Sequence, residues 1–102
     1  MTNESIFAAL ADPTRRDVFE HLAHAPSSVS ALAGKLPVSR PAVSQHLKVL
    51  SDAGLVTVRA EGTRRIYAAR PEALEDLRRW LDRMWGDALA SFAAAAEKET
   101  DK

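Results

Sequence analysis

The sequence contains no cysteine. Disulfide bonds, thiolate metal sites and cysteine nucleophiles are therefore excluded, although the redox compartment stays open because an absence of cysteine fits any of them. No apolar run approaches the ~20 residues that a membrane-spanning helix needs. Residues 1–11 also lack the basic and then apolar order of a secretory signal. We therefore expect a cytoplasmic protein with no membrane partner.

The chain also lacks the motifs on which most enzymes depend. It has no glycine-rich phosphate loop, no nucleophile elbow, no paired acid and base, and no set of four metal ligands. We therefore expect no catalysis, no cofactor and no metal site. His21 and His24 are three residues apart on one predicted helix, but two ligands alone do not define a site, so a ligand role for this pair stays open.

Net charge is also missing, since 14 basic residues balance 14 acidic ones. This balance argues against a nucleic-acid binder, because affinity for a polyanion comes mainly from Lys and Arg. The distribution of the charges argues the other way. Residues 35–70 hold seven basic and two acidic side chains, a net charge of +5, whereas residues 71–102 hold five basic and eight acidic ones, a net charge of −3.

The length of 102 residues and the apolar content of 46% fit one domain, which we place at 1–96, with a flexible tail at 97–102. Apolar periodicity predicts a mainly α fold. The expected helices span 4–11, 13–24, 29–36, 40–52 and 71–96. Three of them begin after the capping residues Asp12, Ser28 and Ser39, and Gly54 can end the fourth. Segments 55–59 and 65–69 predict a small β-hairpin around Glu61-Gly62-Thr63.

The predicted helix at 40–52 has two different faces. At 100° per residue, Val43, Leu47 and Leu50 fall within about 60° of one another, so this side packs inward. The other side is a polar arc of about 140°. Its members are Arg40, Ser44, Gln45 and Lys48. Arginine can bridge guanine and glutamine can bridge adenine, whereas serine and lysine suit phosphates. An ordinary solvated helix could carry the same arc, so the neighbouring elements must decide.

Those neighbouring elements favour DNA binding. A short helix, a tight turn, a polar-faced helix and a hairpin with arginines follow one another in the order of a winged helix-turn-helix. Arg64 and Arg65 lie just past Gly62, where they could reach a minor groove or flanking phosphates, unless they lie in a solvated loop or a salt bridge. Adjacent strand residues point to opposite sides, so we expect at most one of the two to make a close contact, and we favour Arg64.

Three segments resemble the ArsR/SmtB family of bacterial repressors. They are Ala-Asp-Pro-Thr-Arg-Arg at 11–16, Val-Ser-Arg-Pro-Ala-Val-Ser-Gln-His-Leu-Lys-Val-Leu at 38–50, and Ala-Gly-Leu-Val at 53–56. The resemblance extends from about Ile6 to Phe92, and the segment at 38–50 is its most specific part. It implies a winged helix-turn-helix homodimer, formed by the first and last helices, which sits on operator DNA and leaves it when a signal arrives.

The resemblance also implies site residues. The DNA-contact positions of the family match Arg40, Ser44 and Gln45, and plausible additions on the same helix are Ser39, His46 and Lys48. The metal ligands of the family are missing, because residues 30–34 read Ser-Ala-Leu-Ala-Gly where thiolate sensors carry a Cys-Val-Cys type motif. No histidine occurs in 71–102, where zinc sensors carry Asp and His ligands. The resemblance therefore implies a branch that does not sense metals.

The last predicted helix has an apolar stripe too large for one small domain to cover. Together with the first helix it argues for a second copy of the chain, which would set two recognition helices roughly 34 Å apart. The predicted dimer contacts are Ile6, Phe7, Leu10, Leu77, Leu81, Met84, Trp85, Ala88 and Phe92.

The sequence thus predicts a DNA-binding regulator of transcription, a repressor that binds a palindromic operator in duplex DNA as a homodimer and can control its own gene. A winged-helix adaptor for another protein is the alternative, because a fold alone does not fix a function. The polar arc beside a basic hairpin discriminates the two, since an adaptor does not need it and its binding should not fall steeply with salt. The sequence does not identify an inducer.

Overall fold

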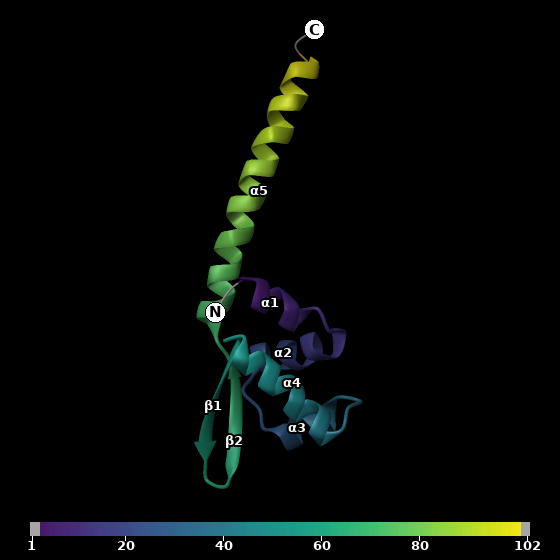
Figure 1. Ribbon diagram of the computed structural model, residues 1–102, viewed down its shortest axis with the longest axis vertical. Coiled ribbons are helices and arrows are strands. Elements are labelled where there is room, and N and C mark those ends of the chain that lie inside the picture. The colour runs from purple at the N-terminus through teal and green to yellow at the C-terminus, as the bar shows by residue number, and fades with distance from the viewer. Residues whose placement is uncertain (1–2, 101–102) are drawn as a thin grey trace.

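The protein is described by a computed structural model that covers residues 3–100, with side chains as far as Glu97. Within this range the chain forms the predicted five helices and one hairpin (Figure 1). The elements are α1 (Asn3–Leu10), α2 (Pro13–His24), α3 (Val29–Lys35), α4 (Arg40–Asp52), β1 (Val56–Glu61), β2 (Arg64–Ala69) and α5 (Pro71–Thr100). The first two residues of the predicted domain and the last two of the predicted tail lie outside the described residues.

Three helices begin at the caps that the sequence predicts. The Asp12 carboxylate and the hydroxyl oxygens of Ser28 and Ser39 each accept a hydrogen bond from the backbone N–H three residues further on, at 3.0–3.3 Å. Pro13 and Pro41 occupy the first turns of α2 and α4, where an N–H has no partner within the helix. These local interactions fix where α2, α3 and α4 start.

A single core joins α1–α4 to the base of the hairpin. Its largest fully buried side chains are Ile6, Val18, Leu32, Val43, Leu47, Leu50 and Leu55. Burial of one such side chain contributes about 1.5–3 kcal/mol, so the three from α4 hold that helix firmly by its inner face. Ile6 is only 1% exposed and packs within its own protomer. It therefore offers no surface to a second copy, which corrects its place among the predicted dimer contacts.

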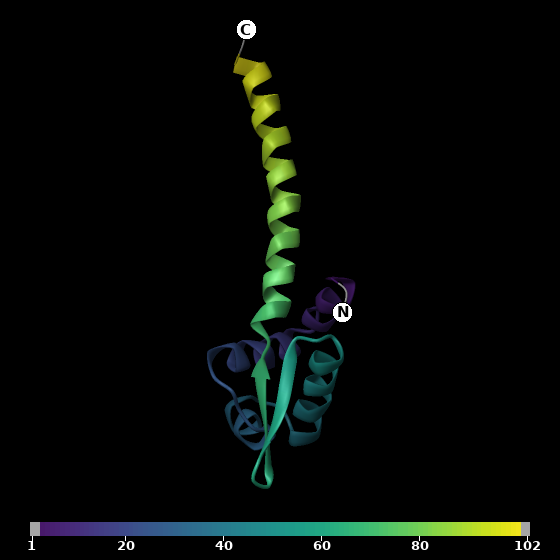
Figure 2. The ribbon, with the colours of Figure 1, turned by 90° about the vertical axis from the view of Figure 1, so that its left-hand side faces the viewer.

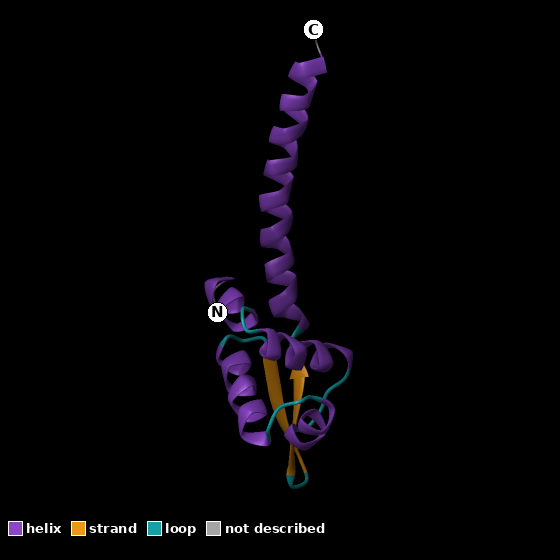
Figure 3. Ribbon diagram, turned by 90° about the vertical axis from the view of Figure 1, so that its right-hand side faces the viewer, coloured by secondary structure: helices purple, strands orange, loops and turns teal. Residues whose placement is uncertain are grey.

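The hairpin is longer than predicted and its loop is shorter. Glu61 pairs with Arg64 across the antiparallel strands, so Gly62 and Thr63 alone form the loop. Gly62 has a φ of +64°, which a glycine adopts without strain. Ser27 and Tyr67 exchange two backbone hydrogen bonds of 2.9 and 2.8 Å, which tie the segment before α3 to β2. Figure 3 shows the hairpin extending past the helices at the lower end of the molecule.

Helix α5 projects away from the rest of the chain, which gives the molecule extents of 70 × 25 × 21 Å (Figures 1 and 2). Every side chain from Asp82 to Glu97 is exposed. The helix also continues to Thr100, through part of the segment predicted to be a flexible tail. The reason is local, since residues 93–96 are four alanines, which favour a helix more than any other residue, and no glycine or proline follows them.

Candidate nucleic-acid interface

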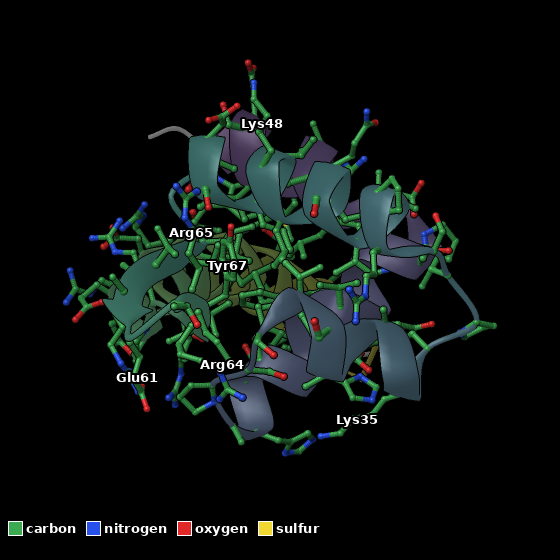
Figure 4. All side chains as sticks on the ribbon, turned by 90° about the horizontal axis from the view of Figure 1, so that it is seen from below. Lys35, Lys48, Glu61, Arg64, Arg65 and Tyr67 are labelled. Atoms are coloured by element: carbon green, nitrogen blue, oxygen red, sulfur yellow. The ribbon has the colours of Figure 1, made fainter. Side chains whose placement is uncertain are left out.

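The polar arc of α4 lies on the surface of the molecule. All four of its members, Arg40, Ser44, Gln45 and Lys48, are exposed. The opposite face of the helix is fixed in the core, so the arc has one orientation relative to the body. Ser39 is also exposed, although its hydroxyl oxygen is used as the cap of α4. Figure 4 places Lys48 on the outer side of this helix.

His46 lies at the edge of the arc and is half-buried. The backbone hydrogen bond from the Arg15 N–H lowers the pKa of the Asp12 carboxyl, and the charge of the nearby His46 imidazole lowers it further. His46 is therefore close to the N-terminus of α2. Of the predicted DNA-contact residues on α4, His46 is the least exposed.

Arg64 and Arg65 are both exposed at the start of β2. Because successive residues of a strand project to opposite sides, the two guanidinium groups diverge. Figure 4 shows Arg65 on the side of the hairpin that faces α4 and Arg64 on the side that faces α3. Tyr67, further along β2, packs against the core and anchors the base of the β1–β2 hairpin, which is the wing of this fold.

The cations of this surface have no carboxylate partner among the described side chains. Among the described side chains, three salt bridges occur, and their cations are Arg59, Arg70 and Arg79. In the same part of the chain, no salt bridge is formed by Arg40, Lys48, Arg64 or Arg65. Cations without a carboxylate partner remain available to neutralise phosphates.

A cleft that the sequence does not reveal separates the wing from the start of α3. It has a volume of about 220 Å³ and is lined by Ser28, Val29, Ser30, Thr63, Arg64 and Arg65. The two lining segments are far apart in the sequence, and the backbone bridge between Ser27 and Tyr67 brings them together. Ser28 and Ser30 were therefore missed as surface neighbours of the wing arginines, because no local spacing connects them to the hairpin.

The predicted dimer residues that remain after the correction at Ile6 form a surface along α1 and α5. Phe7 contacts Trp80 edge-on, with ring centroids 5.2 Å apart, which joins the two helices. The half-buried members are Leu10, Leu77 and Leu81. The exposed members are Phe7, Met84, Trp85, Ala88 and Phe92. Phe92 is 73% exposed, so it lies almost entirely outside its own protomer.

The two histidines of α2 are not joined by further ligands. His21 Nδ1 lies 2.9 Å from the Asp17 carbonyl oxygen, and His24 is exposed. Across the residues that the structure covers, no group of three or more His, Cys, Asp or Glu side chains could hold a metal ion. In that same range, no helix has the length and apolarity needed to cross a membrane. The absence of metal sensing stays a prediction.

Comparisons with known proteins agree with this geometry. The helix-turn-helix domain family matches residues 10–59, from the end of α1 into β1. The HTH-type transcriptional regulator Rv2034 of Mycobacterium tuberculosis is 56% identical over 93 residues, which cover 91% of this chain and 87% of that relative. A regulator of transcription is thus similar to this chain over nearly the whole length of both proteins.

Solved structures point the same way. An ArsR-like transcriptional regulator from Rhodococcus sp. RHA1 has a TM-score of 0.82 at 37% identity, over 92% of this chain and 89% of that one. A second solved structure is the homodimeric winged helix-turn-helix DNA-binding domain of Mb0332 from Mycobacterium bovis, a possible ArsR-family regulator. It has a TM-score of 0.64 at 30% identity, and the match covers 83% of this chain and 76% of that one. These relatives favour a DNA-binding regulator over an adaptor. The chain belongs to the ArsR/SmtB family of winged helix-turn-helix transcriptional regulators.

Proposed function

We propose that two copies of this chain form a dimer through α1 and α5, and that the dimer binds a palindromic operator and represses transcription. The observation that carries the proposal is the exposed arc of α4 beside the wing. Four cations without salt bridges lie on these two elements: Arg40, Lys48, Arg64 and Arg65. A twofold axis would repeat this surface about 34 Å away, at the next major groove on the same side of the duplex.

The apolar surface of α5 supports the dimer. Trp85, Leu89 and Phe92 are 56%, 61% and 73% exposed, and no other part of the described chain covers them. Soluble proteins seldom leave such a contiguous apolar stripe in water, so a partner is expected. A second copy supplies the same stripe, and the homodimeric relative from Mycobacterium bovis makes this partner the natural choice.

The residues of the interface have different roles in this proposal. Arg40 and Gln45 read base edges in the major groove, because their side chains can each form two hydrogen bonds with one base. Ser39, Ser44 and Lys48 hold phosphates and fix the register, and His46 supports the edge of the arc. In the cytoplasm, an occupied operator that overlaps a promoter, that of its own gene included, blocks transcription until a signal releases the dimer.

A titration tests the proposal. The purified chain is added to fluorescent duplexes from its own upstream region and to a scrambled duplex of equal composition, each at two salt concentrations. We expect tighter binding to the native duplex, and on both duplexes an affinity that falls steeply with salt. Salt-insensitive, equal binding to both duplexes would contradict the proposal and restore the adaptor.

A further inference from the structure

Another cleft separates α1 from the end of α4. Its volume is about 310 Å³, and its lining residues are Ser5, Ala8, Ala9, Arg15, Val49, Asp52 and Ala53. Figure 2 shows α1, in purple, beside the end of α4 from which β1 continues. None of the residues predicted to contact DNA or a second copy lines this cleft. Small-molecule sites usually measure roughly 300–1,000 Å³, so a compound of a few non-hydrogen atoms fits here.

Two opposite charges line this cleft without neutralising each other. Arg15 comes from α2, and Asp52 comes from the last turn of α4. Neither of them forms a salt bridge with a described side chain. Apart from Ser5, the other lining residues are three alanines and Val49, which is 38% exposed. The cleft thus offers a cation, an anion and a small apolar surface to one ligand.

The Arg15 guanidinium is only partly satisfied by the protein. Its Nη1 donates a hydrogen bond to the Ala9 carbonyl oxygen at 3.1 Å, which holds the group at the end of α1. Its Nε is buried and has no hydrogen-bond partner among the described residues. A buried donor without an acceptor is unfavourable. A carboxylate can pair with the Nε and Nη2 edge of a guanidinium through two parallel hydrogen bonds, so Arg15 keeps an edge that suits a carboxylate.

The cleft lies off the proposed dimer interface. Phe7, one of the predicted dimer contacts, faces α5 and contacts Trp80 there. At 100° per residue, Ser5 and Ala8 lie about 160° and about 100° from Phe7 around α1. A ligand in the cleft would therefore touch a helix that joins the two copies and, at the same time, the helix whose polar arc faces DNA.

We propose that this cleft binds a small aliphatic amino acid as a zwitterion, and that the bound amino acid releases the operator. Its carboxylate pairs with Arg15, its ammonium group pairs with Asp52, and its side chain packs against Ala8 and Val49. A ligand with both charges neutralises both walls, whereas Asp52 repels a simple anion and Arg15 repels a simple amine. The effector role rests on the proposed function, since it assumes that α4 lies on duplex DNA.

The buried Nε of Arg15 supplies the link to DNA binding in this proposal. A carboxylate reaches Nε only when the walls around it separate, so the ligand binds an opened arrangement of α1 and α4 better than the closed one. An opened cleft changes the position of α4 relative to the dimer helix α1. The two α4 helices of the dimer then no longer match successive major grooves, and affinity for the operator falls.

The first test measures binding without DNA. L-alanine, L-valine and L-leucine are titrated into the full chain, and the amide NMR signals are followed. At least one of the three should give a saturable shift at Ala8, Ala9 and Ala53. Isovalerate and isobutylamine, which match valine but lack its ammonium or its carboxylate group, should bind at least about tenfold more weakly. The inference is overturned if none of the three amino acids binds, or if isovalerate binds as tightly as valine.

Asp52→Asn tests the second charge. Asp52 is exposed and has no salt bridge among the described residues, so the variant should fold normally. It should bind the amino acid about tenfold more weakly, yet bind isovalerate no more weakly than the unchanged protein, because a repelling carboxylate is gone. Asp17→Asn, at an exposed position of α2 outside the cleft, should leave both affinities unchanged. Equal loss of both ligands in Asp52→Asn would contradict the zwitterion.

The last test measures the effector role. Fluorescence anisotropy on the native duplex, with and without a saturating amount of the amino acid that binds, should show operator affinity lowered about fivefold or more. The operator should lower the affinity for the amino acid by the same factor, since coupling is reciprocal. Asp52→Asn should bind the operator normally and lose the response. Unchanged operator affinity in saturating amino acid would overturn the effector role, whereas a preference of the ligand-free protein for the native duplex tests the proposed function separately.

Discussion

Some side chains of α4 lie in the core of the protein and others lie on its surface. Val43, Leu47 and Leu50 are fully buried, and the residues that alternate with them, such as Arg40 and Ser44, are exposed. Because the inner three fix the helix in rotation, each outer side chain has a defined direction. A single substitution in the arc should therefore change DNA binding without changing the fold.

Arg40→Ala tests this division. The variant should lose about 1 to 3 kcal/mol of binding free energy on the native duplex and discriminate less between bases at one position, since a bidentate contact to guanine is removed. Arg79→Ala is the control, because Arg79 lies on α5 and pairs with Asp76 there. Fluorescence anisotropy on native and single-base-changed duplexes gives both values. If Arg40→Ala bound the native duplex with unchanged affinity, Arg40 would not be one of the residues that contact base edges.

Asp12 gives a prediction of pH dependence. The hydrogen bond from the Arg15 N–H, with the nearby charge of His46, lowers the pKa of Asp12 below its ordinary value of 3.8. The carboxylate therefore stabilises the fold above pH 3.8, and this stabilisation is lost as the pH falls through the lowered value. Asp12→Asn keeps a capping oxygen but removes the charge. It should melt at a lower temperature than the unchanged protein at pH 7, and the difference should shrink in strong acid. Circular dichroism melts that show the same gap at both pH values would contradict this origin.

Whole elements differ in how far the sequence predicts them. The starts of α2, α3 and α4 were predictable because a cap such as Asp12 or Ser39 acts on amides three residues away. The end of α5 was missed because an alanine run carries no stop signal. The burial of Ile6 and the cleft at Arg64 were missed for another reason. Each depends on which distant segment packs alongside, and periodicity shows only that a face is apolar or polar.

The exposed half of α5 is the element on which the dimer depends. Leu89 is 61% exposed and contributes nothing to the core of its own protomer, so Leu89→Glu should leave the fold intact. Two such charges buried at a twofold interface would be strongly unfavourable. We expect sedimentation equilibrium to show monomers at concentrations where the unchanged protein is dimeric, with weaker operator binding. Asp87→Ser, at an exposed polar position of the same helix, should stay dimeric. A Leu89→Glu variant that also stays dimeric would refute the proposed interface.

At the scale of the whole molecule, a net charge of zero conceals a separation of charge. The segment 35–70, with a net charge of +5, forms α4 and the wing, whereas 71–102, with −3, consists mainly of α5. Figure 1 shows the wing tip and the far end of α5 at opposite ends of the molecule. A polyanion attracts the first part and repels the second, so the charge distribution itself favours an approach with α4 and the wing toward DNA.

Hydroxyl-radical footprinting of the full chain, on the native duplex that it binds, tests most directly whether a dimer reads two half-sites. Two protected regions related by a dyad are expected, with centres about 10 base pairs apart, because a twofold dimer presents one α4 to each of two successive major grooves. Two chains should be bound per duplex at saturation. A single protected region with one chain bound would contradict a dimeric operator-binding regulator.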